Sequence, residues 1–476
     1  MQFKVLPLVI AAVLSGCSLA PDYETPAAPE TAGWNGVDSA AEQAAVTPDW
    51  KQFMADDQLQ SLVDMALANN KDLRQTVLNV AALRAQYQIQ DASSKPAIDA
   101  SASAARSRSN GSVGSSYSAS VGVTSYELDF FGRVKNLSDQ ALESYLSSEE
   151  TRRSAVISLV AEVASAYVTL LTNQELLSLS EETVTAYEET LKLVQTRYDA
   201  GYSDALTLAQ SKTALYSAQA TVASYKLAVS QQYNTLRQLV GAPFNMTFEK
   251  TLPLEDGKML YELKGGAPST LLLQRPDIMA AEHTLRADNA NIGAARAAFF
   301  PSINLTATAG VASSSLDNLF KSGSETWTFA PSISLPIFNW GSNEASLNAA
   351  KIAKQASIVS YEQAIETAFK EVSDAILGQQ YYMQQWDAQK ANLDANKDYY
   401  ELAKMRYEKG NDSYMDLLDA QRSLFSARES ELSSHLNLLT SRVSLFKAMG
   451  GGWSAADESS VSPEQAMSDA IASDEE

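Results

Sequence analysis

The chain has 476 residues, of which 45% are hydrophobic, and its formal net charge is −21. This acidic balance argues against a nucleic-acid-binding surface, which is basic in most proteins. No run of 18 apolar residues occurs after the N-terminus, so we expect no membrane-spanning helix, and a closed β-barrel remains the other structure that can cross a bilayer.

The N-terminus indicates an exported lipoprotein. Lys4 precedes an apolar run that ends in Leu14-Ser15-Gly16-Cys17, which predicts a secretory signal peptide. Cys17 is the only cysteine, so it cannot form a disulfide within the chain. The Leu-Ser-Gly-Cys run resembles the bacterial lipobox, in which the cysteine carries S-diacylglycerol and an N-acyl chain. The alternative is an ordinary cleavage site with a coincidental cysteine. By the same resemblance, Ser18 in place of Asp favours the outer membrane.

A seven-residue apolar repeat follows, and it occurs twice. Apolar residues stand seven apart from Val156 to Tyr198 and from Leu208 to Leu236, and the same frame returns 209 residues later, from Ile365 to Leu445. A strict period of seven predicts long helices that pair in a left-handed supercoil. Further similarities at shifts of 205 and 207 residues indicate a tandem duplication with short insertions.

Each copy predicts a helix, a β-hairpin, a long helix and a further helix. In the first copy, alternation from Ile98 to Ala104 and from Tyr117 to Val123 predicts two strands, joined by a turn over residues 107–116. In the second copy, the strands flank residues 313–325. Residues 134–196 contain no Pro or Gly, and a helix of that length spans about 95 Å, which suits a rod or a tube.

These patterns divide the chain into six predicted segments. They are a signal peptide at 1–16; a lipidated arm at 17–57; a first repeat at 58–243 with a hairpin at 97–128 and a helical pair at 134–241; a linker at 244–274; a second repeat at 275–450 with a hairpin at 302–337 and a helical pair at 342–449; and an acidic, disordered tail at 451–476.

Several motifs in this order resemble the TolC family of outer membrane factors, and in particular its lipidated OprM/NodT-like branch. The more specific ones are Tyr126-Glu127-Leu128-Asp129-Phe130-Phe131-Gly132-Arg133, Arg275-Pro276-Asp277-Ile278, Ala294-Ala295-Arg296-Ala297-Ala298-Phe299-Phe300-Pro301, Leu335-Pro336-Ile337-Phe338 and Leu417-Leu418-Asp419-Ala420-Gln421-Arg422. The resemblance covers essentially the whole mature chain.

The resemblance implies a mainly α-helical protein with a membrane β-barrel. Three chains would form a homotrimer with a 12-stranded barrel in the outer membrane, continuous with a 12-helix tube in the periplasm. Four strands from one chain cannot close a barrel, which makes the trimer physically sensible. The implied function is the export duct of a tripartite efflux system that carries drugs or other small molecules. The implied partners are a periplasmic adaptor protein, an inner-membrane pump of the RND type and outer-membrane lipid.

The sequence shows no sign of an enzyme, a metal site or a cofactor other than the covalent lipid on Cys17. The two histidines, His283 and His435, lie in different helical stretches and are expected to be surface or packing residues. No phosphate-binding loop or nucleophile motif occurs.

The turn of the second helical pair is the candidate gate. Asp416 and Asp419 share a helix face, whereas their counterparts in the first copy are Thr207 and Gln210. Three copies of Asp419 could ring an opening and attract cations. By resemblance, Arg406, Tyr407 and Asp419 match the family's periplasmic gate. The alternative is a solvated acidic turn in which Asp412 caps the next helix.

The two turns are also candidate docking tips for the adaptor. The residues concerned are Gly201, Tyr202, Ser203 and Asp204 in the first turn and Gly410, Asn411 and Asp412 in the second. Two other functions stay open: a structural coiled-coil lipoprotein that braces the envelope, and a duct for metal ions or secreted products.

Overall fold

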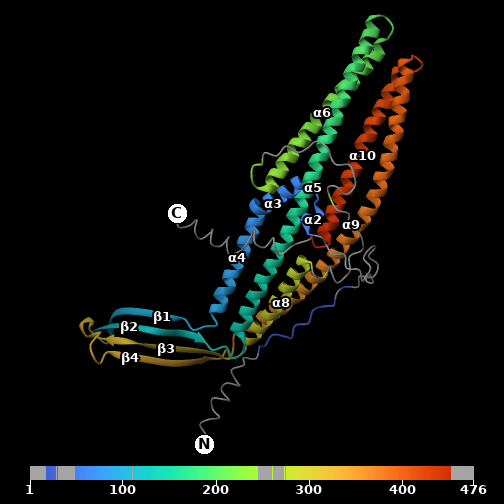
Figure 1. The fold of residues 1–476 in the computed structure, drawn as a ribbon. Helices are drawn as coiled ribbons and strands as arrows, with labels where there is room; N and C mark the ends of the chain where they lie inside the picture. Colours follow the sequence, from blue (N-terminus) through green and yellow to red (C-terminus); the bar gives the residue numbers. More distant parts are fainter. Residues whose placement is uncertain are drawn as a thin grey trace. The chain divides into compact units, whose positions relative to one another are not determined.

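The computed structural model describes residues 18–27, 29, 49–109, 111–244, 260, 273 and 275–451. It divides into two compact units (Figure 1): unit 1 comprises residues 1–28, 79–151 and 277–364, and unit 2 comprises residues 29–78, 152–276 and 365–476. Each unit contains parts of both copies of the repeat. The predicted signal peptide, Cys17, most of the arm, most of the linker and the tail lie outside the described residues.

The two copies contain the same elements in the same order. The first copy has α4 (Lys71–Ala92), β1 (Ile98–Ser109), β2 (Ser112–Glu127), α5 (Arg133–Asp199) and α6 (Ala205–Val240). The second copy has α8 (Pro276–Ala297), β3 (Ser302–Ser313), β4 (Glu325–Ser334), α9 (Ser342–Glu408) and α10 (Tyr414–Ala448). Helices α5 and α9 have 67 residues each. The predicted order of helix, hairpin, long helix and helix is therefore confirmed.

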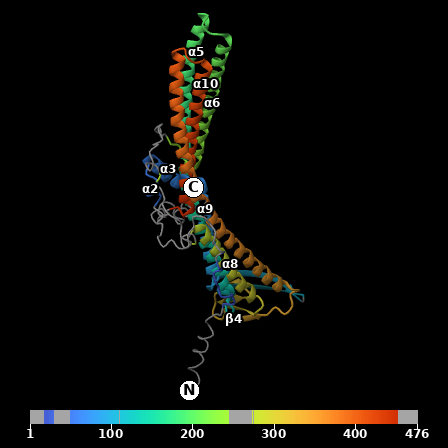
Figure 2. The same ribbon diagram turned by 90° about the vertical axis from the view of Figure 1, so that its right-hand side faces the viewer.

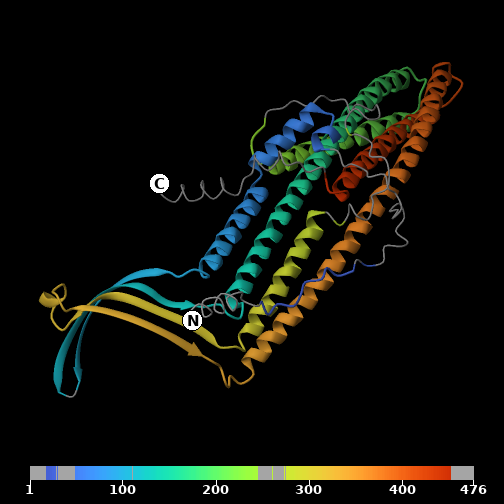
Figure 3. The ribbon, with the colours of Figure 1, turned by 60° about the horizontal axis from the view of Figure 1, so that its bottom comes forward.

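Unit 1 contains a four-stranded antiparallel sheet in the order β1-β2-β3-β4 (Figure 3). Strands β2 and β3 join the hairpins of the two copies, with Val121 opposite Ala309. On one face, hydroxyl groups pair across the strands, as in Ser103 and Ser118 at 2.8 Å, while alanines occupy the alternate positions. Strands β1 and β4 are the edges of this sheet.

The first hairpin turn is shorter than predicted. The sequence predicts a turn over residues 107–116, but β1 continues to Ser109 and β2 begins at Ser112. Cross-strand pairs such as Ser107 with Gly114 extend the ladder through this polar cluster, because pairing overrides the turn preference of Ser and Gly. The second hairpin has the predicted long connection, which contains the short helix η1 (Leu316–Asn318).

The core of unit 2 forms where α2 (Trp50–Phe53) and α3 (Asp57–Asn69) pack on the long helices. The rings of Phe53 and Phe446 stack with centroids 4.3 Å apart, and Val163 and Leu170 are fully buried beside them. Trp50, Phe53 and Met54, which fall within the predicted arm at 17–57, therefore belong to this core. The prediction of an extended arm came from the Pro/Ala/Glu-rich composition of the preceding residues. The aromatic side chains of Trp50 and Phe53 are instead buried in the core.

The predicted apolar seam is confirmed over much of unit 2. The seam positions Val156, Ile365, Val372 and Tyr407 are all buried, whereas Tyr198 near the tip is 40% exposed. Figure 2 shows α5, α6, α9 and α10 side by side, and a shared cluster of buried side chains joins all four. Among the described residues, α5 alone has a stretch apolar and long enough to cross a membrane, and 72% of that stretch is buried. Packing within the core accounts for its apolar character.

Candidate functional site

The tips of the two helical pairs in unit 2 are built in the same way. Helices α5 and α9 are each followed, two residues after their last residue, by a glycine, Gly201 and Gly410, whose φ angles of +79° and +75° favour glycine. In each turn, two backbone amides bond back to the helix, for example Tyr202 to the carbonyl oxygen of Arg197 at 2.7 Å. This pattern is a Schellman motif, which satisfies carbonyl groups at the helix end. The duplication thus preserves the backbone of the tips.

The helices that follow begin with different caps. Asp204 caps α6 by accepting a hydrogen bond from the Thr207 amide at 2.7 Å, and this bond lowers the pKa of Asp204. Ser413 caps α10, and the Asp416 carboxylate accepts a bond from the Ser413 amide at 3.1 Å. The alternative in which Asp412 caps α10 is therefore wrong. This capping box accounts for Asp416 within one chain.

Arg406 and Asp412 close the second turn as an ion pair. The Nε and Nη2 atoms of Arg406 donate to the two carboxylate oxygens of Asp412 at 2.6 and 2.8 Å. These bonds lower the pKa of Asp412 and raise the pKa of Arg406. The guanidinium group of Arg406 thus binds across its own turn.

Tyr407 lies inside the tip. It is 6% exposed, and its ring centroid lies 6.1 Å from that of Tyr414. The guanidinium carbon of Arg197 lies 5.0 Å from the Tyr407 ring centroid, which is a cation–π arrangement between α5 and α9. Tyr187 completes this buried cluster, and burial raises the pKa of Tyr414 to about 12. Tyr407 therefore links the two helical pairs within one chain.

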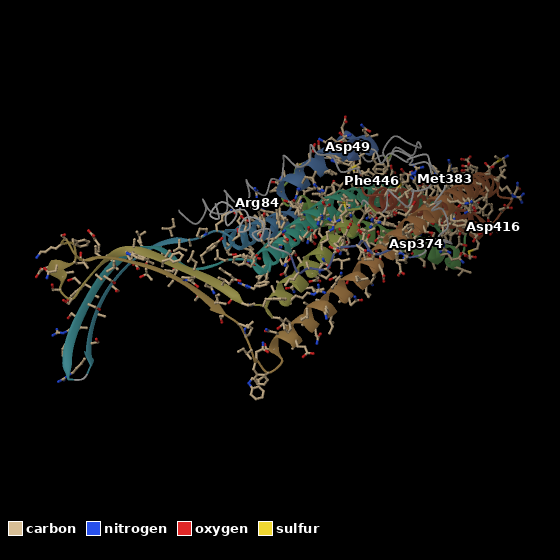
Figure 4. The ribbon with its side chains drawn as sticks, turned by 90° about the horizontal axis from the view of Figure 1, so that it is seen from below. Asp49, Arg84, Asp374, Met383, Asp416 and Phe446 are labelled. Atoms are coloured by element: carbon tan, nitrogen blue, oxygen red, sulfur yellow. The ribbon has the colours of Figure 1, made fainter. Side chains whose placement is uncertain are left out.

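Asp419 is the exposed acid of this group. Its Oδ2 atom accepts a hydrogen bond from the Tyr399 hydroxyl of α9 at 3.1 Å, and this bond raises the pKa of Tyr399. Both side chains are exposed, so the Asp419 carboxylate can still meet solvent and ions. Figure 4 labels the nearby Asp416, which lies among the side chains at the end of the α9–α10 pair.

The candidate docking tips are mostly exposed. Tyr202 is 86% exposed and the neighbouring Leu206 is 66% exposed, while Gly410 and Asn411 have open surroundings on the second tip. Ser203 is half-buried. Tyr202 and Leu206 thus leave apolar side-chain area exposed on the first tip.

From the sequence we predicted neither Tyr399 nor Arg197 in this site, and we did not predict the capping role of Ser413. Ser413 has a detectable signal, because a Ser three residues before an acid at a helix start indicates a capping box. Tyr399 lies outside the apolar seam, and Arg197 acts across two helical pairs, so their partners depend on tertiary packing.

The two histidines lie far from the tips in sequence and have local partners. His283 Nδ1 lies 2.6 Å from the Glu143 carboxylate in unit 1, and His435 stacks on Trp386 in unit 2 with ring centroids 4.6 Å apart. Within the described part of the chain, no group of three or more His, Cys, Asp and Glu side chains is placed to hold a metal ion.

Comparison with known proteins supports an export role. The outer membrane efflux protein family matches residues 62–242 and 267–451, once over each copy. The chain is 47% identical over 467 residues to the toluene efflux pump outer membrane protein TtgC of Pseudomonas putida, covering 95% of this chain and 96% of that protein. It is 41% identical to the outer membrane protein OprJ of Pseudomonas aeruginosa, covering 95% of this chain and 96% of OprJ.

Solved structures agree with this relationship. The open state of the MtrE outer membrane channel of Neisseria gonorrhoeae has a TM-score of 0.84 and 39% identity, covering 92% of this chain and 98% of that channel. The CmeC outer membrane channel of Campylobacter jejuni has a TM-score of 0.85 and 28% identity, covering 94% and 99%. The predicted fold class, efflux function and outer-membrane location are confirmed. The chain belongs to the outer membrane efflux protein family.

Proposed function

We propose that three copies of this chain form an outer-membrane duct that works with a periplasmic adaptor and an RND-type inner-membrane pump. The observation that carries the trimer is the open sheet of unit 1, whose edge strands β1 and β4 expose unpaired backbone groups. Lipid offers no hydrogen bonds to such edges, so a membrane sheet must close on itself. Three copies supply twelve strands, which is within the range of known barrels.

The side chains of β4 support a barrel wall. Trp327, Phe329 and Ile333 are 80%, 63% and 71% exposed, and they share one face of the strand. Thr328 and Ser332 occupy the other face. Alternation of apolar and polar residues is what a strand with lipid on one side and an aqueous lumen on the other requires.

We further propose that the α9–α10 tip forms the periplasmic gate. Asp419 would contribute one carboxylate per chain to a ring that attracts cations. The Arg406–Asp412 pair and the buried Tyr407 would fix the shape of the tip on which this ring depends. Asp416 would support the ring through its capping of α10. The chain has no nucleotide-binding motif, so the energy for transport would come from the pump.

The exposed turns at both tips would receive the adaptor. Tyr202 and Leu206 offer apolar area, and the main-chain groups of Gly201, Gly410 and Asn411 are accessible on the turns. Replacement of Tyr202 by Asp should weaken adaptor copurification without altering the trimer. Unchanged copurification of the adaptor would show that Tyr202 is not part of the docking surface.

Cys17 would carry S-diacylglycerol and an N-acyl chain and would anchor the mature chain to the outer membrane. The support is its position after Leu14-Ser15-Gly16 as the only cysteine. Intact-protein mass spectrometry should detect the acyl mass, and Cys17→Ser should remove it. Unmodified Cys17 in the mature protein would contradict this assignment.

The cargo would be small apolar or amphiphilic molecules. Relatives are named as toluene, solvent and antibiotic efflux proteins, and this cargo class is proposed by analogy with them. Expression with the matching adaptor and pump in a host that lacks its own duct should restore resistance to solvents and antibiotics. Resistance to metal salts alone would favour a metal-ion duct.

The central experiment is conductance in planar lipid bilayers. Purified trimers should open discrete, ohmic pores, and tags inserted in residues 314–324 should be reachable on intact cells. A structural lipoprotein that only braces the envelope would give stable oligomers without conductance and tags reachable only after permeabilisation.

A further inference from the structure

The start of the described chain lies on unit 1 as an ordered segment. Residues 18–25, which we call the N-terminal strap, lie beside α8 (Figure 3). The Asn289 Nδ2 atom donates to the Pro21 carbonyl oxygen, and an Arg296 Nη1 atom donates to the Leu19 carbonyl oxygen, each at 2.9 Å. Further along, the Tyr23 hydroxyl donates to Glu282 at 3.3 Å. The strap is thus bonded to α8 at three places.

The residues of α8 that contact the N-terminal strap lie on one face of the helix. Glu282, Arg286, Asn289, Gly293 and Arg296 are spaced by four, three, four and three residues, so they lie along a single helix face. Arg286 bonds Glu282 at 2.7 Å and its guanidinium carbon lies 5.0 Å from the Tyr23 ring centroid. The groups that receive the strap are therefore held in place by one another.

Lys354 of α9 adds a further support. Its Nζ atom donates to the Asn289 Oδ1 atom at 2.8 Å. This bond fixes the amide of Asn289 with its NH₂ group directed at the strap.

Gly293 makes room for the strap. A Cβ atom at this position would lie 2.5 Å from Asn136 Nδ2 and 2.8 Å from the Ala20 backbone nitrogen. Glycine weakens a helix interior relative to alanine, so its presence here requires a reason. The close approach of the strap and of Asn136 supplies that reason.

Asn136 supplies an unused donor at the end of the strap. It lies in the first turn of α5, soon after β2 ends, and it is 1% exposed. Its Oδ1 atom accepts a hydrogen bond from the Ser18 hydroxyl at 2.8 Å, while its Nδ2 atom has no partner among the described residues. Buried donors are normally paired, so this amide calls for an acceptor that the described residues do not supply.

We infer that the α8 face and Asn136 form a docking site for the acylated N-terminus, in which Asn136 Nδ2 donates to the amide carbonyl of the N-acyl group on Cys17. The inference rests on the proposed lipidation of Cys17. Consecutive Cα atoms are about 3.8 Å apart, so an acyl group on the residue before Ser18 would be within reach of Asn136. The lipid chains would then start at the level where the sheet meets the helices of unit 1.

The first test measures docking by proteolysis of the full-length acylated protein in membranes. A glutamyl endopeptidase that cuts after the exposed Glu24 would release residues 17–24 with their acyl chains, which mass spectrometry detects. Gly293→Ala should accelerate this release at least tenfold. Gly378→Ala is the matched control, because its added Cβ would meet nothing closer than 3.6 Å. Equal release rates in wild type and Gly293→Ala would overturn the docking site.

The second test measures coupling between Asn136 and the acyl group. Asn136→Ala should accelerate release in the acylated protein by a larger factor than in a Cys17→Ser chain exported behind an ordinary cleavable leader. Equal factors would overturn the assignment of Asn136 to the acylated residue. The mass of the released peptide distinguishes the failure of lipidation from the failure of docking. A released peptide without acyl mass contradicts lipidation of Cys17. An acylated peptide whose release rate is unchanged by Gly293→Ala contradicts docking.

Discussion

Three acids near the α9–α10 tip have three different local partners. Asp412 pairs with Arg406, Asp416 caps the helix with Ser413, and Asp419 accepts a bond from Tyr399. The first two carboxylates bond across their own turn, and the third bonds to the neighbouring helix of the pair. Asp419 is exposed, and its carboxylate accepts its bond from a neutral hydroxyl rather than from a cation.

We expect Asp419→Asn to reduce cation selectivity. Asparagine can still accept the Tyr399 hydrogen bond, so the substitution removes charge and leaves the local structure in place. Loss of one carboxylate from each chain of the duct should lower the cation-to-anion permeability ratio by roughly twofold or more and relieve block by multivalent cations. Reversal potentials in planar bilayers measure this ratio, with Asp394→Asn as an exposed control. An unchanged permeability ratio would show that Asp419 is a solvated surface residue without a role in selectivity.

The Arg406–Asp412 pair should make the tip sensitive to acid. The hydrogen bonds from Arg406 hold the pKa of Asp412 below its usual 3.8. Because the pKa of Asp412 is lower in the folded state, the ion pair stabilises the turn fully when the pH is above the usual pKa of Asp. This stabilisation disappears as the pH falls through the lowered pKa of the folded state. Asp412→Asn should therefore speed hydrogen exchange of the Gly410 and Asn411 amides at pH 7. The ratio to wild type should approach one in strong acid.

The matched control for this prediction is Glu408→Gln, which removes a nearby exposed acid that takes no part in the Arg406–Asp412 ion pair. It should leave the exchange ratio near one at both pH values. Equal exchange in Asp412→Asn and wild type at pH 7 would show that the pair does not hold the turn.

At this scale the sequence indicated positions better than partners. The resemblance pointed to Arg406, Tyr407 and Asp419, and all three lie at one tip. The bond from Arg406 to Asp412 depends on the path of a Schellman turn, and the bond from Tyr399 to Asp419 joins two helices. Neither follows from a seven-residue period, because that period describes only which residues face the partner helix.

At the scale of helices, the duplicated apolar seam explains most of unit 2, and a buried polar pair in the second copy departs from it. Trp386 and Glu431 occupy seam positions, are 3% and 7% exposed, and are joined by a 2.7 Å bond from the indole Nε1 to the carboxylate. His435 stacks on the same indole ring. In the first copy the position of Glu431 is occupied by Val222, so this polar pair belongs to the α9–α10 pair alone.

We expect Glu431→Leu to destabilise this helical pair by about 1–3 kcal/mol, because the buried indole N–H loses its acceptor. Glu431→Gln keeps an acceptor and should cost less. Trp386→Phe combined with Glu431→Leu removes both polar groups and should recover most of the loss. The midpoint of thermal unfolding, followed by the helical circular dichroism signal, measures these differences. A Glu431→Leu protein that melts at or above the wild-type temperature would show that the bond is dispensable.

The extent of the long helices could be predicted because nothing interrupts them. Residues 134–196 lack Pro and Gly, and α5 runs from Arg133 to Asp199. Prediction failed where packing or pairing decides the outcome. Ser107 and Gly114 pair within strands in spite of their turn preference, and Trp50 and Phe53 join a core that is built mostly by residues far away in sequence.

At the scale of the whole molecule, the chain is incomplete by itself. A sheet with two open edges and an apolar outer face cannot be stable in a bilayer as a single copy. The sequence predicted this requirement from four short alternating strands. The register could not be predicted, because small residues such as Ala and Ser fit either face and the bulge after Val123 shifts the β2–β3 pairing.

The two faces of β4 allow a direct test of the proposed barrel. Phe329 and Thr328 are adjacent and exposed, and adjacent residues of a strand point to opposite faces. If the apolar face meets lipid, Phe329→Lys places a charge in hydrocarbon at a cost of about 2–4 kcal/mol, whereas Thr328→Lys places the same charge in the aqueous lumen. Phe329→Lys should therefore reduce heat-resistant trimers in isolated outer membranes. Thr328→Lys should assemble normally and shift ion selectivity towards anions. Equal assembly of the two variants would contradict a lipid-facing β4.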